Sequence, residues 1–198
     1  MNLLCLDLEG VLVPEIWVAV ADATGIAELR KTTRDVPVYD DLMGLRLGIL
    51  RERNVDFATV DRVIGRLEPL PGAADFLAWA RRRFQVAVIS DTFYEFAQRL
   101  MAKLGYPLLL CHRLEIEAGR IVGYRLRQAD PKRSAVRAFK ALQYRVVAVG
   151  DSFNDVSMLE EADPGVFFRA PENVTRQFPQ FACAGSYEAL QRLLEPHA

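Results

Sequence analysis

Acidic residues directly follow two short apolar runs of the sequence. Asp7 and Glu9 come after the run Leu-Leu-Cys-Leu, and Asp151 comes after the run Val-Val-Ala-Val-Gly. Alternate residues of an extended chain lie on one side, so Asp7 and Glu9 would point into one crevice. Carboxylates gathered in this way repel one another, and a hard divalent cation with oxygen ligands, such as Mg²⁺, relieves that repulsion. The spacing therefore predicts a magnesium site, near which Asp155 adds a further carboxylate.

Hydroxyl and ammonium groups occur at similar places in the chain. Ser90, Asp91 and Thr92 follow another apolar run and precede a helical pattern that begins near Phe93. Hydroxyls and backbone N–H groups at the start of a helix bind anions. Lys132, in the sequence Asp-Pro-Lys-Arg, could balance negative charge at the same place. Each group also has an ordinary explanation, as a helix cap or a solvated lysine, but their combination indicates an anion site beside a cation.

The elements that must position these groups alternate along the chain. Short apolar runs predict strands at residues 3–6, 86–89, 108–111, 146–149 and 166–168. Helical patterns lie between or after them, at residues 73–83, 93–104, 134–142, 155–161 and 187–194. This alternation predicts an α/β fold with a doubly wound, Rossmann-like parallel sheet covered on both faces. Ligands of such sheets bind at the carboxyl ends of the strands, so residues distant in sequence would meet at one edge.

Two segments depart from this alternation. Residues 114–126 contain two short strand-like pieces around Ala118 and Gly119, which predict a hairpin. Residues 14–70 hold several helical patterns and are bracketed by Pro14 and by the sequence Pro-Leu-Pro-Gly at residues 69–72, which is a strong break. We predict that residues 14–70 form a helical cap inserted after the first strand, so that residues 1–13 and 71–198 form the core.

Composition excludes several classes of protein. The chain has 198 residues, of which 51% are apolar and 26% are charged, and its formal net charge is −1. It is therefore too apolar to be disordered, and it lacks the basic surface of a protein that wraps nucleic acid.

The cysteines and histidines of the sequence indicate the cellular compartment and argue against a zinc site. The three cysteines offer neither a disulfide framework nor zinc spacing, and we expect Cys5 and Cys111 to be buried free thiols. His112 and His197 are isolated in sequence, and we expect both to be ordinary surface or loop residues. With no signal peptide and no apolar run long enough to cross a bilayer, we expect a cytoplasmic protein with no membrane partner.

The motifs, taken in order, resemble those of the haloacid dehalogenase-like superfamily of phosphotransferases. The resemblance covers nearly the whole chain and runs Asp-x-Glu, Ser, Lys and Gly-Asp-x-x-Asn-Asp. It implies that Asp7 attacks phosphorus and forms an aspartyl-phosphate. It further implies that Glu9 is the acid/base, that Ser90 binds a phosphoryl oxygen and that Lys132 steadies the phosphoryl group.

The same resemblance implies the metal ligands and several substrate contacts. Mg²⁺ would be held by Asp7, by the backbone carbonyl of Glu9 and by Asp151. Asn154 and Asp155 would orient substrate and water.

The segment GDSFNDVSML, residues 150–159, is especially similar to the phosphoserine phosphatase branch of that superfamily. Members of the branch meet the substrate amine with a cap glutamate and its carboxylate with a cap arginine. Glu15 and Arg46 are the matching residues here. Met43, one helical turn before Arg46, is a further candidate for the pocket wall, although a place in the core of the cap is at least as consistent with its type.

Three positions depart from the pattern of the branch. Glu9 stands where an aspartate is usual, Asp91 and Thr92 stand where glycines are common, and Glu15 lies one residue closer to the nucleophile. The Asp-x-Glu form, the short cap and the chain length resemble a bacterial subgroup that passes the phosphoryl group from phosphoserine to homoserine as well as to water. We hypothesise that Glu9 activates water poorly, so that a second amino-acid alcohol can compete.

Other functions remain open from the sequence. The cap sets specificity, so the substrate could be another small phosphate ester. A signalling receiver domain also uses acids, a hydroxyl and a lysine at strand ends, but there the lysine follows rather than precedes the last motif. A catalytically inactive binding module is disfavoured by the full set of polar groups. Small molecules are the expected partners, and a homodimer is compatible with the sequence without being required by it.

Overall fold

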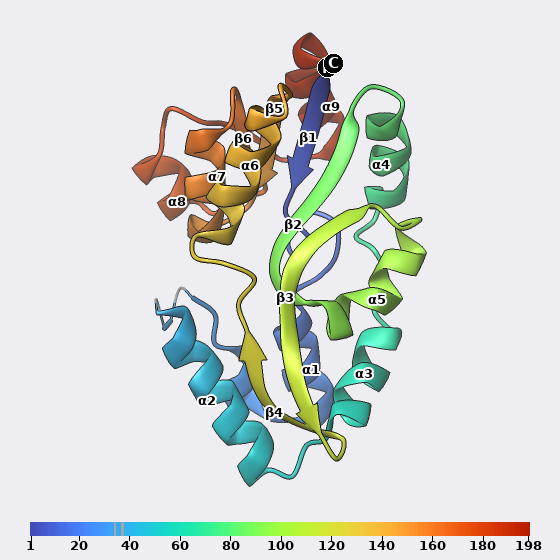
Figure 1. Cartoon of the computed structure of the whole chain (residues 1–198), viewed down its shortest axis with the longest axis vertical. Helices are drawn as coiled ribbons and strands as arrows, with labels where there is room; N and C mark the ends of the chain where they lie inside the picture. The colour runs from blue at the N-terminus through green and yellow to red at the C-terminus, as the bar shows by residue number, and fades with distance from the viewer. Residues whose placement is uncertain (34, 37) are drawn as a thin grey trace.

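A central sheet organises the computed structural model, which describes residues 1–33, 35, 36 and 38–198 (Figure 1). In this part of the chain the sheet has seven strands in the order β4-β3-β2-β1-β5-β6-β7. Their bounds are Asn2–Leu6 for β1, Gln85–Phe93 for β2, Leu108–Glu117 for β3, Arg120–Arg125 for β4, Arg145–Gly150 for β5, Gly165–Phe168 for β6 and Ala182–Ala184 for β7. Neighbouring strands are parallel except β3 and β4, which are antiparallel. The predicted α/β class is confirmed.

Helices cover both faces of the sheet. Their bounds are Ile16–Thr24 for α1, Tyr39–Glu52 for α2, Phe57–Gly65 for α3, Ala73–Arg81 for α4, Tyr94–Lys103 for α5, Pro131–Ala141 for α6, Val156–Glu161 for α7, Glu172–Gln177 for α8 and Tyr187–Leu194 for α9. Leu4 and Leu6 of β1 share one apolar cluster with α4, α5 and α9, whereas Leu3 and Cys5 share another with α6, α7 and α8. Because successive strand residues point to opposite faces, a strand buried on both faces must be apolar throughout.

The polar site lies where the direction of sheet building reverses. The chain adds β2 and β3 on one side of β1, then crosses to add β5, β6 and β7 on the other. The backbone N–H of Asp7 donates to the carbonyl of Val149 at 3.0 Å, so the ends of β1 and β5 lie side by side. In open parallel sheets this reversal leaves a crevice in which ligands bind.

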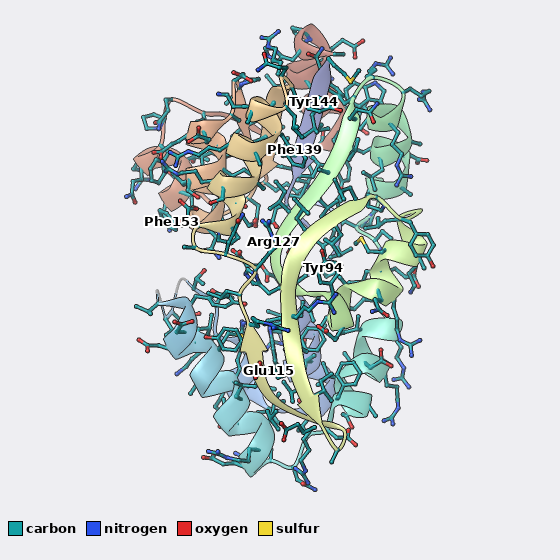
Figure 2. The ribbon with its side chains drawn as sticks, in the orientation of Figure 1. Tyr94, Glu115, Arg127, Phe139, Tyr144 and Phe153 are labelled. Carbon is teal, nitrogen blue, oxygen red and sulfur yellow. The ribbon has the colours of Figure 1, made fainter. Side chains whose placement is uncertain are left out.

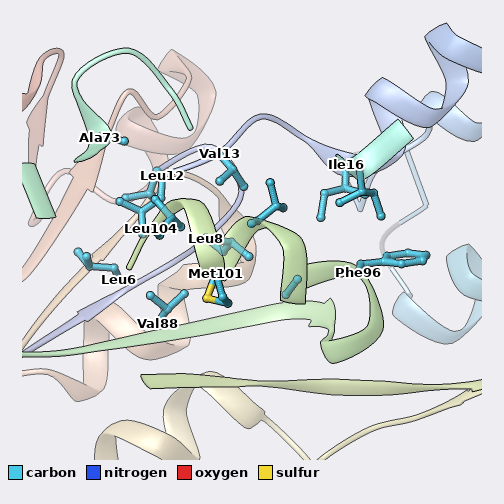
Figure 3. Close-up of a cluster of buried hydrophobic side chains, with 14 of the residues drawn as sticks. Leu6, Leu8, Leu12, Val13, Ile16, Ala73, Val88, Phe96, Met101 and Leu104 are labelled. Carbon is cyan, nitrogen blue, oxygen red and sulfur yellow. The ribbon is translucent and has the colours of Figure 1, made fainter. Parts of the chain in front are cut away.

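Apolar side chains anchor the turn that follows Asp7. Leu8, Leu12 and Val13 are fully buried, and the N–H groups of Leu12 and Val13 both donate to the carbonyl of Leu8. Figure 3 shows these side chains packed in one cluster with Ile16 of α1 and Phe96 of α5. The burial that stabilises the fold therefore also fixes the backbone that carries the acidic residues.

The helices α1 to α3 and the β3–β4 hairpin make up the end of the molecule remote from the C-terminus (Figure 1). The N–H of Phe57 donates to the carbonyl of Gly119 at 2.9 Å, which ties α3 to the tip of the hairpin. Trp17 of α1 packs edge-on against Phe96 of α5, with ring centroids 5.6 Å apart. The hairpin predicted at residues 114–126 is confirmed. The boundaries of the proposed cap, residues 14–70, stay a prediction.

The structure differs from the predicted elements in three respects. The third predicted strand and the first half of the hairpin are one strand, β3, and β2 runs on to Phe93 so that α5 begins at Tyr94. The short elements α8 and β7 carry too little apolar periodicity to be recognised from sequence. No helix in the described residues is long and apolar enough to cross a membrane.

Candidate active site

Asp7 is the buried acid at the end of β1. The N–H of Leu8 donates to its Oδ1 at 2.7 Å, and the Nζ of Lys132 lies 3.0 Å from the same oxygen. Burial raises the pKa of Asp7, the negative charges of Asp155 and Asp151 raise it further, and Lys132 opposes the rise. The carboxylate therefore needs positive charge nearby in order to remain ionised, and so to be nucleophilic.

Asp155 holds Lys132 in place from the side away from solvent. It is completely buried, and its Oδ1 lies 2.6 Å from the Nζ of Lys132. Its Oδ2 accepts the N–H groups of Asp151 at 2.9 Å and Ser152 at 3.0 Å. Burial alone would lower the pKa of Lys132, but the carboxylates of Asp155 and Asp7 outweigh it and raise that pKa. Lys132 is thus favoured as a cation and lies in contact with Asp7 and Asp155.

Three carboxylates of this site could hold a metal ion together. Oxygen atoms of Asp7, Asp151 and Asp155 all lie within 4.8 Å of one another. A Cβ at Gly10, whose φ is +77°, would lie 2.4 Å from Oδ2 of Asp151, so only glycine allows the carboxylate to approach this turn. A set of buried carboxylate oxygens with neither histidine nor cysteine fits a hard divalent cation.

Glu9 occupies a different part of the site from the carboxylates of the metal cluster. Its Oε2 accepts the backbone N–H of Ile16, at the start of α1, at 2.7 Å. Burial, together with the negative charge of Glu15, raises the pKa of Glu9 to about 8. A carboxyl group with such a pKa can donate a proton near neutral pH and take one back afterwards.

Ser90, Asp91 and Thr92 lie in an irregular part of β2. The register with β3 shifts between Ile89 and Phe93, and the N–H of Thr92 donates to the Oγ of Ser90 at 3.3 Å. The two hydroxyl residues are buried. We expected Ser90 and Thr92 to lie at the start of a helix. In the structure they lie within β2, and α5 begins two residues after Thr92.

Arg46 forms the opposite wall of the site. It is buried, its guanidinium carbon lies 4.7 Å from the ring centroid of Trp17, and its Nη2 donates to the carbonyl of Lys31 at 2.9 Å. Its Nε has no hydrogen-bond partner among the described residues. Burial lowers the pKa of Arg46 to about 10, which still leaves it charged at neutral pH. Its guanidinium therefore retains donors for an anion.

The groups described above surround a cavity of about 90 Å³. The predicted site residues on its wall are Asp7, Glu9, Glu15, Arg46, Ser90, Asp91, Thr92, Lys132, Asp151 and Asn154. Glu15 and Asn154 are exposed at the rim. Because the wall combines a buried lysine and arginine with several acids, the cavity suits a small ligand that carries both charges.

Two predicted residues are not among those that line the cavity. Asp155 lies behind Lys132, and Met43 is fully buried in the apolar core with its Sδ 3.8 Å from Nη1 of Arg46. Met43 therefore supports the arginine from behind, and its neighbour Leu42 lines the cavity instead.

Sequence reasoning missed Tyr39 and Trp17, and it misjudged His112. Tyr39 and Trp17 line the cavity, but an aromatic residue in a helical segment gives no signal of its own. The expectation that His112 is a surface or loop residue is wrong, because it lies within β3 and is only 2% exposed. His112 comes directly before the exposed Arg113, and its buried contacts are with residues distant in the sequence, so no local pattern indicates its burial. Cys5 and Cys111 are buried free thiols as expected.

The parallel sheet and the cluster of acids with Lys132 at its reversal point form the arrangement that the motifs led us to expect. A model of the haloacid dehalogenase-like hydrolase family matches residues 1–163. The chain belongs to this family of hydrolases, as the motifs led us to expect.

Two relatives with more than half of their aligned residues identical to this chain are phosphoserine phosphatases. The chain is 58% identical over 193 residues to phosphoserine phosphatase ThrH of Pseudomonas aeruginosa, a match that covers 97% of this chain and 94% of that protein. It is 56% identical to a phosphoserine phosphatase of Pseudomonas syringae pv. tomato, over 97% of this chain and 81% of that protein. Among solved structures, an apo phosphoserine phosphatase superposes with a TM-score of 0.80 at 22% identity and covers 98% of both chains. At 22% identity this superposition establishes a shared fold and not a shared activity.

Proposed function

We propose that the protein hydrolyses phosphoserine through an aspartyl-phosphate on Asp7 and also transfers the phosphoryl group to homoserine. The observation that carries the proposal is the position of Asp7, which faces the cavity 3.0 Å from Lys132 with Glu9 on the same wall. The names of relatives 58% and 56% identical support phosphoserine as the donor.

In the first half-reaction a carboxylate oxygen of Asp7 attacks phosphorus, and the bond from phosphorus to the serine oxygen breaks. Protonated Glu9 donates its proton to that oxygen, so serine leaves as a neutral alcohol. Lys132 and the hydroxyls of Ser90 and Thr92 face the negative charge that spreads over the phosphoryl oxygens.

Mg²⁺ is the cation that we propose for the carboxylate cluster. When bound, it neutralises part of the negative charge shared by the phosphoryl group and the carboxylates. Asp7 and Asp151 would hold it, with the backbone carbonyl of Glu9, while Asp155 holds Lys132. The oxygen-only character of the cluster supports this choice over zinc.

In the second half-reaction the ionised Glu9 takes a proton from the attacking hydroxyl. The oxygen of water or of homoserine then bonds to phosphorus, and the bond to Asp7 breaks, which yields phosphate or phosphohomoserine. Glu9 is longer than an aspartate by one methylene, about 1.5 Å, and errors of about 1 Å are costly in catalysis. An aspartyl-phosphate that water attacks slowly leaves time for a larger alcohol.

The amino-acid part of the donor would contact residues of the inserted segment. Arg46 retains guanidinium donors beyond the bond to Lys31, and an arginine holds a carboxylate with two parallel hydrogen bonds. Glu15 at the rim would meet the ammonium group, and Asn154 would complete the polar wall. Homoserine carries the same two charged groups as serine, so the same contacts would hold it.

The closest alternative is a phosphatase for another small ester. Turnover of a panel of phosphomonoesters in Mg²⁺ distinguishes the two. We expect phosphoserine to be preferred over sugar phosphates, with Asp7→Asn inactive. Equal turnover of sugar phosphates and phosphoserine would contradict the amino-acid assignment while leaving the phosphatase chemistry intact.

A further inference from the structure

His112 is a buried histidine whose two ring nitrogens face different partners. Its Nδ1 accepts the backbone N–H of Arg127 at 3.1 Å. Its Nε2 lies 3.5 Å from Oδ1 of Asp91, a residue of the cavity wall. An imidazole nitrogen that accepts a hydrogen bond carries no proton, so the proton of the neutral ring is on Nε2 and points toward Asp91.

Arg127 connects the same histidine to the segment that carries Lys132. Its backbone N–H contacts His112, and its Nη2 donates to the carbonyl of Pro131, the residue before Lys132, at 2.9 Å. Figure 2 places Arg127 where the chain passes from β4 to α6. Lys132 in turn lies 3.9 Å from Oδ2 of Asp91, which closes a ring of contacts from Asp91 through His112 and Arg127 back to Asp91.

Aromatic neighbours fix the imidazole and the backbone of Asp91. The ring of Tyr39 lies edge-on to His112 with centroids 5.9 Å apart, and that of Phe93 is 6.3 Å away. The hydroxyl of Tyr39 donates to the backbone carbonyl of Asp91 at 2.8 Å, although the two residues are 52 positions apart. The carboxylate of Asp91 is thus held by its backbone and by His112.

The position of Asp91 matters because Lys132 already has two closer acidic partners. Lys132 lies 3.0 Å from Asp7 and 2.6 Å from Asp155, but 3.9 Å from Asp91. Burial opposes ionisation of Asp91, yet the charge of Lys132 and the contact with the Nε2–H of His112 hold its pKa below the usual value, so it is an anion. An unrestrained anion at this distance would move into full contact with the ammonium group and compete with Asp7 and with a phosphoryl group.

We propose that His112 is a positioning residue that holds Asp91 away from Lys132, so that Lys132 remains available to Asp7 and the phosphoryl group. The inference rests on the proposed function, since it concerns the same reaction. His112 touches neither substrate nor reacting atoms in this role and acts through Asp91.

The tautomer of His112 tests the hydrogen-bond arrangement without any enzymatic assay. The chain has two histidines, so ¹⁵N-histidine labelling with a His197→Gln variant leaves one imidazole to observe by NMR. We expect a neutral ring with its proton on Nε2 at pH 8, and a shift of the Nε2 signal in Asp91→Asn. A proton on Nδ1 would overturn the proposal even if the enzyme proves to act on phosphoserine.

A double-mutant cycle then tests the consequence for catalysis. His112→Phe keeps the aromatic contacts but removes both the donor to Asp91 and the acceptor of the Arg127 N–H, and we expect kcat/KM for phosphoserine to fall about tenfold or more. His112→Gln, whose amide nitrogen reaches the place of Nε2, should retain most of the activity, whereas His112→Asn should not. In an Asp91→Asn background, His112→Phe should cause a much smaller loss, limited to that of the contact with Arg127.

The cycle separates positioning from simple structural support. Equal losses from His112→Phe in both backgrounds would show that the ring acts by packing alone and would overturn the proposal. If His112→Phe does not fold, the Gln and Asn variants provide the same comparison, and equal activity of those two would contradict it. Inactivity of the native enzyme toward phosphoserine would instead refute the proposed function, and the NMR result would still stand.

Discussion

Glu9 differs from the other acids of the site in what surrounds it. Asp7, Asp151 and Asp155 lie close to one another, and Asp7 and Asp155 contact Lys132, whereas the carboxyl of Glu9 accepts the N–H of Ile16. Burial and the charge of Glu15 raise the pKa of Glu9 to about 8. This separation of environments assigns the nucleophile and the acid/base to different carboxyl groups in our mechanism.

The raised pKa of Glu9 predicts an alkaline limit for the first half-reaction. Protonated Glu9 is the proton donor to serine, and raising the pH through about 8 removes that proton. We therefore expect kcat/KM for phosphoserine to fall about tenfold for each further pH unit. The measurement is phosphate release from pH 6 to 9.5 at constant Mg²⁺. A Glu9→Gln variant should lack this limb, and a native profile that is flat to pH 9.5 would contradict the assignment.

The length of Glu9 predicts the partition between acceptors. Glu9→Asp withdraws the carboxyl by about one C–C bond, about 1.5 Å, toward the geometry usual in the phosphatase branch. With phosphoserine and homoserine supplied together, we expect a lower ratio of phosphohomoserine to phosphate. An unchanged ratio would show that Glu9 does not control which acceptor is used.

Arg46 should determine the affinity for the donor carboxylate. Arg46→Lys keeps the charge but loses the planar pair of donors, so we expect KM for phosphoserine to rise by about 10- to 100-fold, as for loss of a charged hydrogen bond, with a smaller change in kcat. Arg51→Lys, on an exposed residue of the same helix, is the matched control. An unchanged KM would remove Arg46 from the binding site.

Secondary structure elements account for what sequence could and could not predict. The apolar strands β1 and β5 carry Asp7 and Asp151 at their ends, and both residues can be read directly from the sequence because strand polarity determines where they lie. The contacts of His112 with Asp91 and of Tyr39 with Asp91 join residues far apart in the chain, so no local pattern indicates them. Motif spacing thus predicts where Asp7 and Asp151 lie. The positions of Tyr39 and His112 depend on tertiary packing, which the spacing of motifs does not indicate.

The turn after β1 offers a test at the scale of elements. Gly10→Ala would place a Cβ 2.4 Å from Oδ2 of Asp151 at a φ of +77°, so it should lose activity and stability. Gly25, at a φ of +70°, has open space where a Cβ would lie, with no atom within 4 Å, and serves as the matched control. We expect Gly25→Ala to cost only the left-handed strain, about 1 kcal/mol, by denaturant unfolding, with activity retained. Equal costs and equal activities for both variants would contradict the tight approach of Asp151.

At the scale of the whole molecule, a net charge of −1 conceals a concentrated negative site. Asp7, Asp151 and Asp155 lie together, with Lys132 as the buried cation in contact with two of them. The fold tolerates this cluster because apolar clusters on both faces of the sheet fix the strands that carry it. Binding of a cation should therefore stabilise the folded chain.

Magnesium should raise the thermal stability of the protein. A ligand that binds only the folded state adds about 2.7 kcal/mol at one hundred times its Kd, so we expect Tm to rise with Mg²⁺ and to fall back with a chelator. Asp151→Asn should abolish most of the rise, whereas Glu172→Gln, on the exposed surface of α8, should not. A Tm that does not respond to Mg²⁺ would contradict the metal assignment.

The most direct test of the whole account is a single incubation of the protein with phosphoserine and Mg²⁺, with and without homoserine, followed by identification of the products. We predict serine and phosphate in the first case, and phosphohomoserine in addition in the second, both abolished by Asp7→Asn. Formation of neither phosphate nor phosphohomoserine would contradict the central claim that Asp7 accepts the phosphoryl group of phosphoserine.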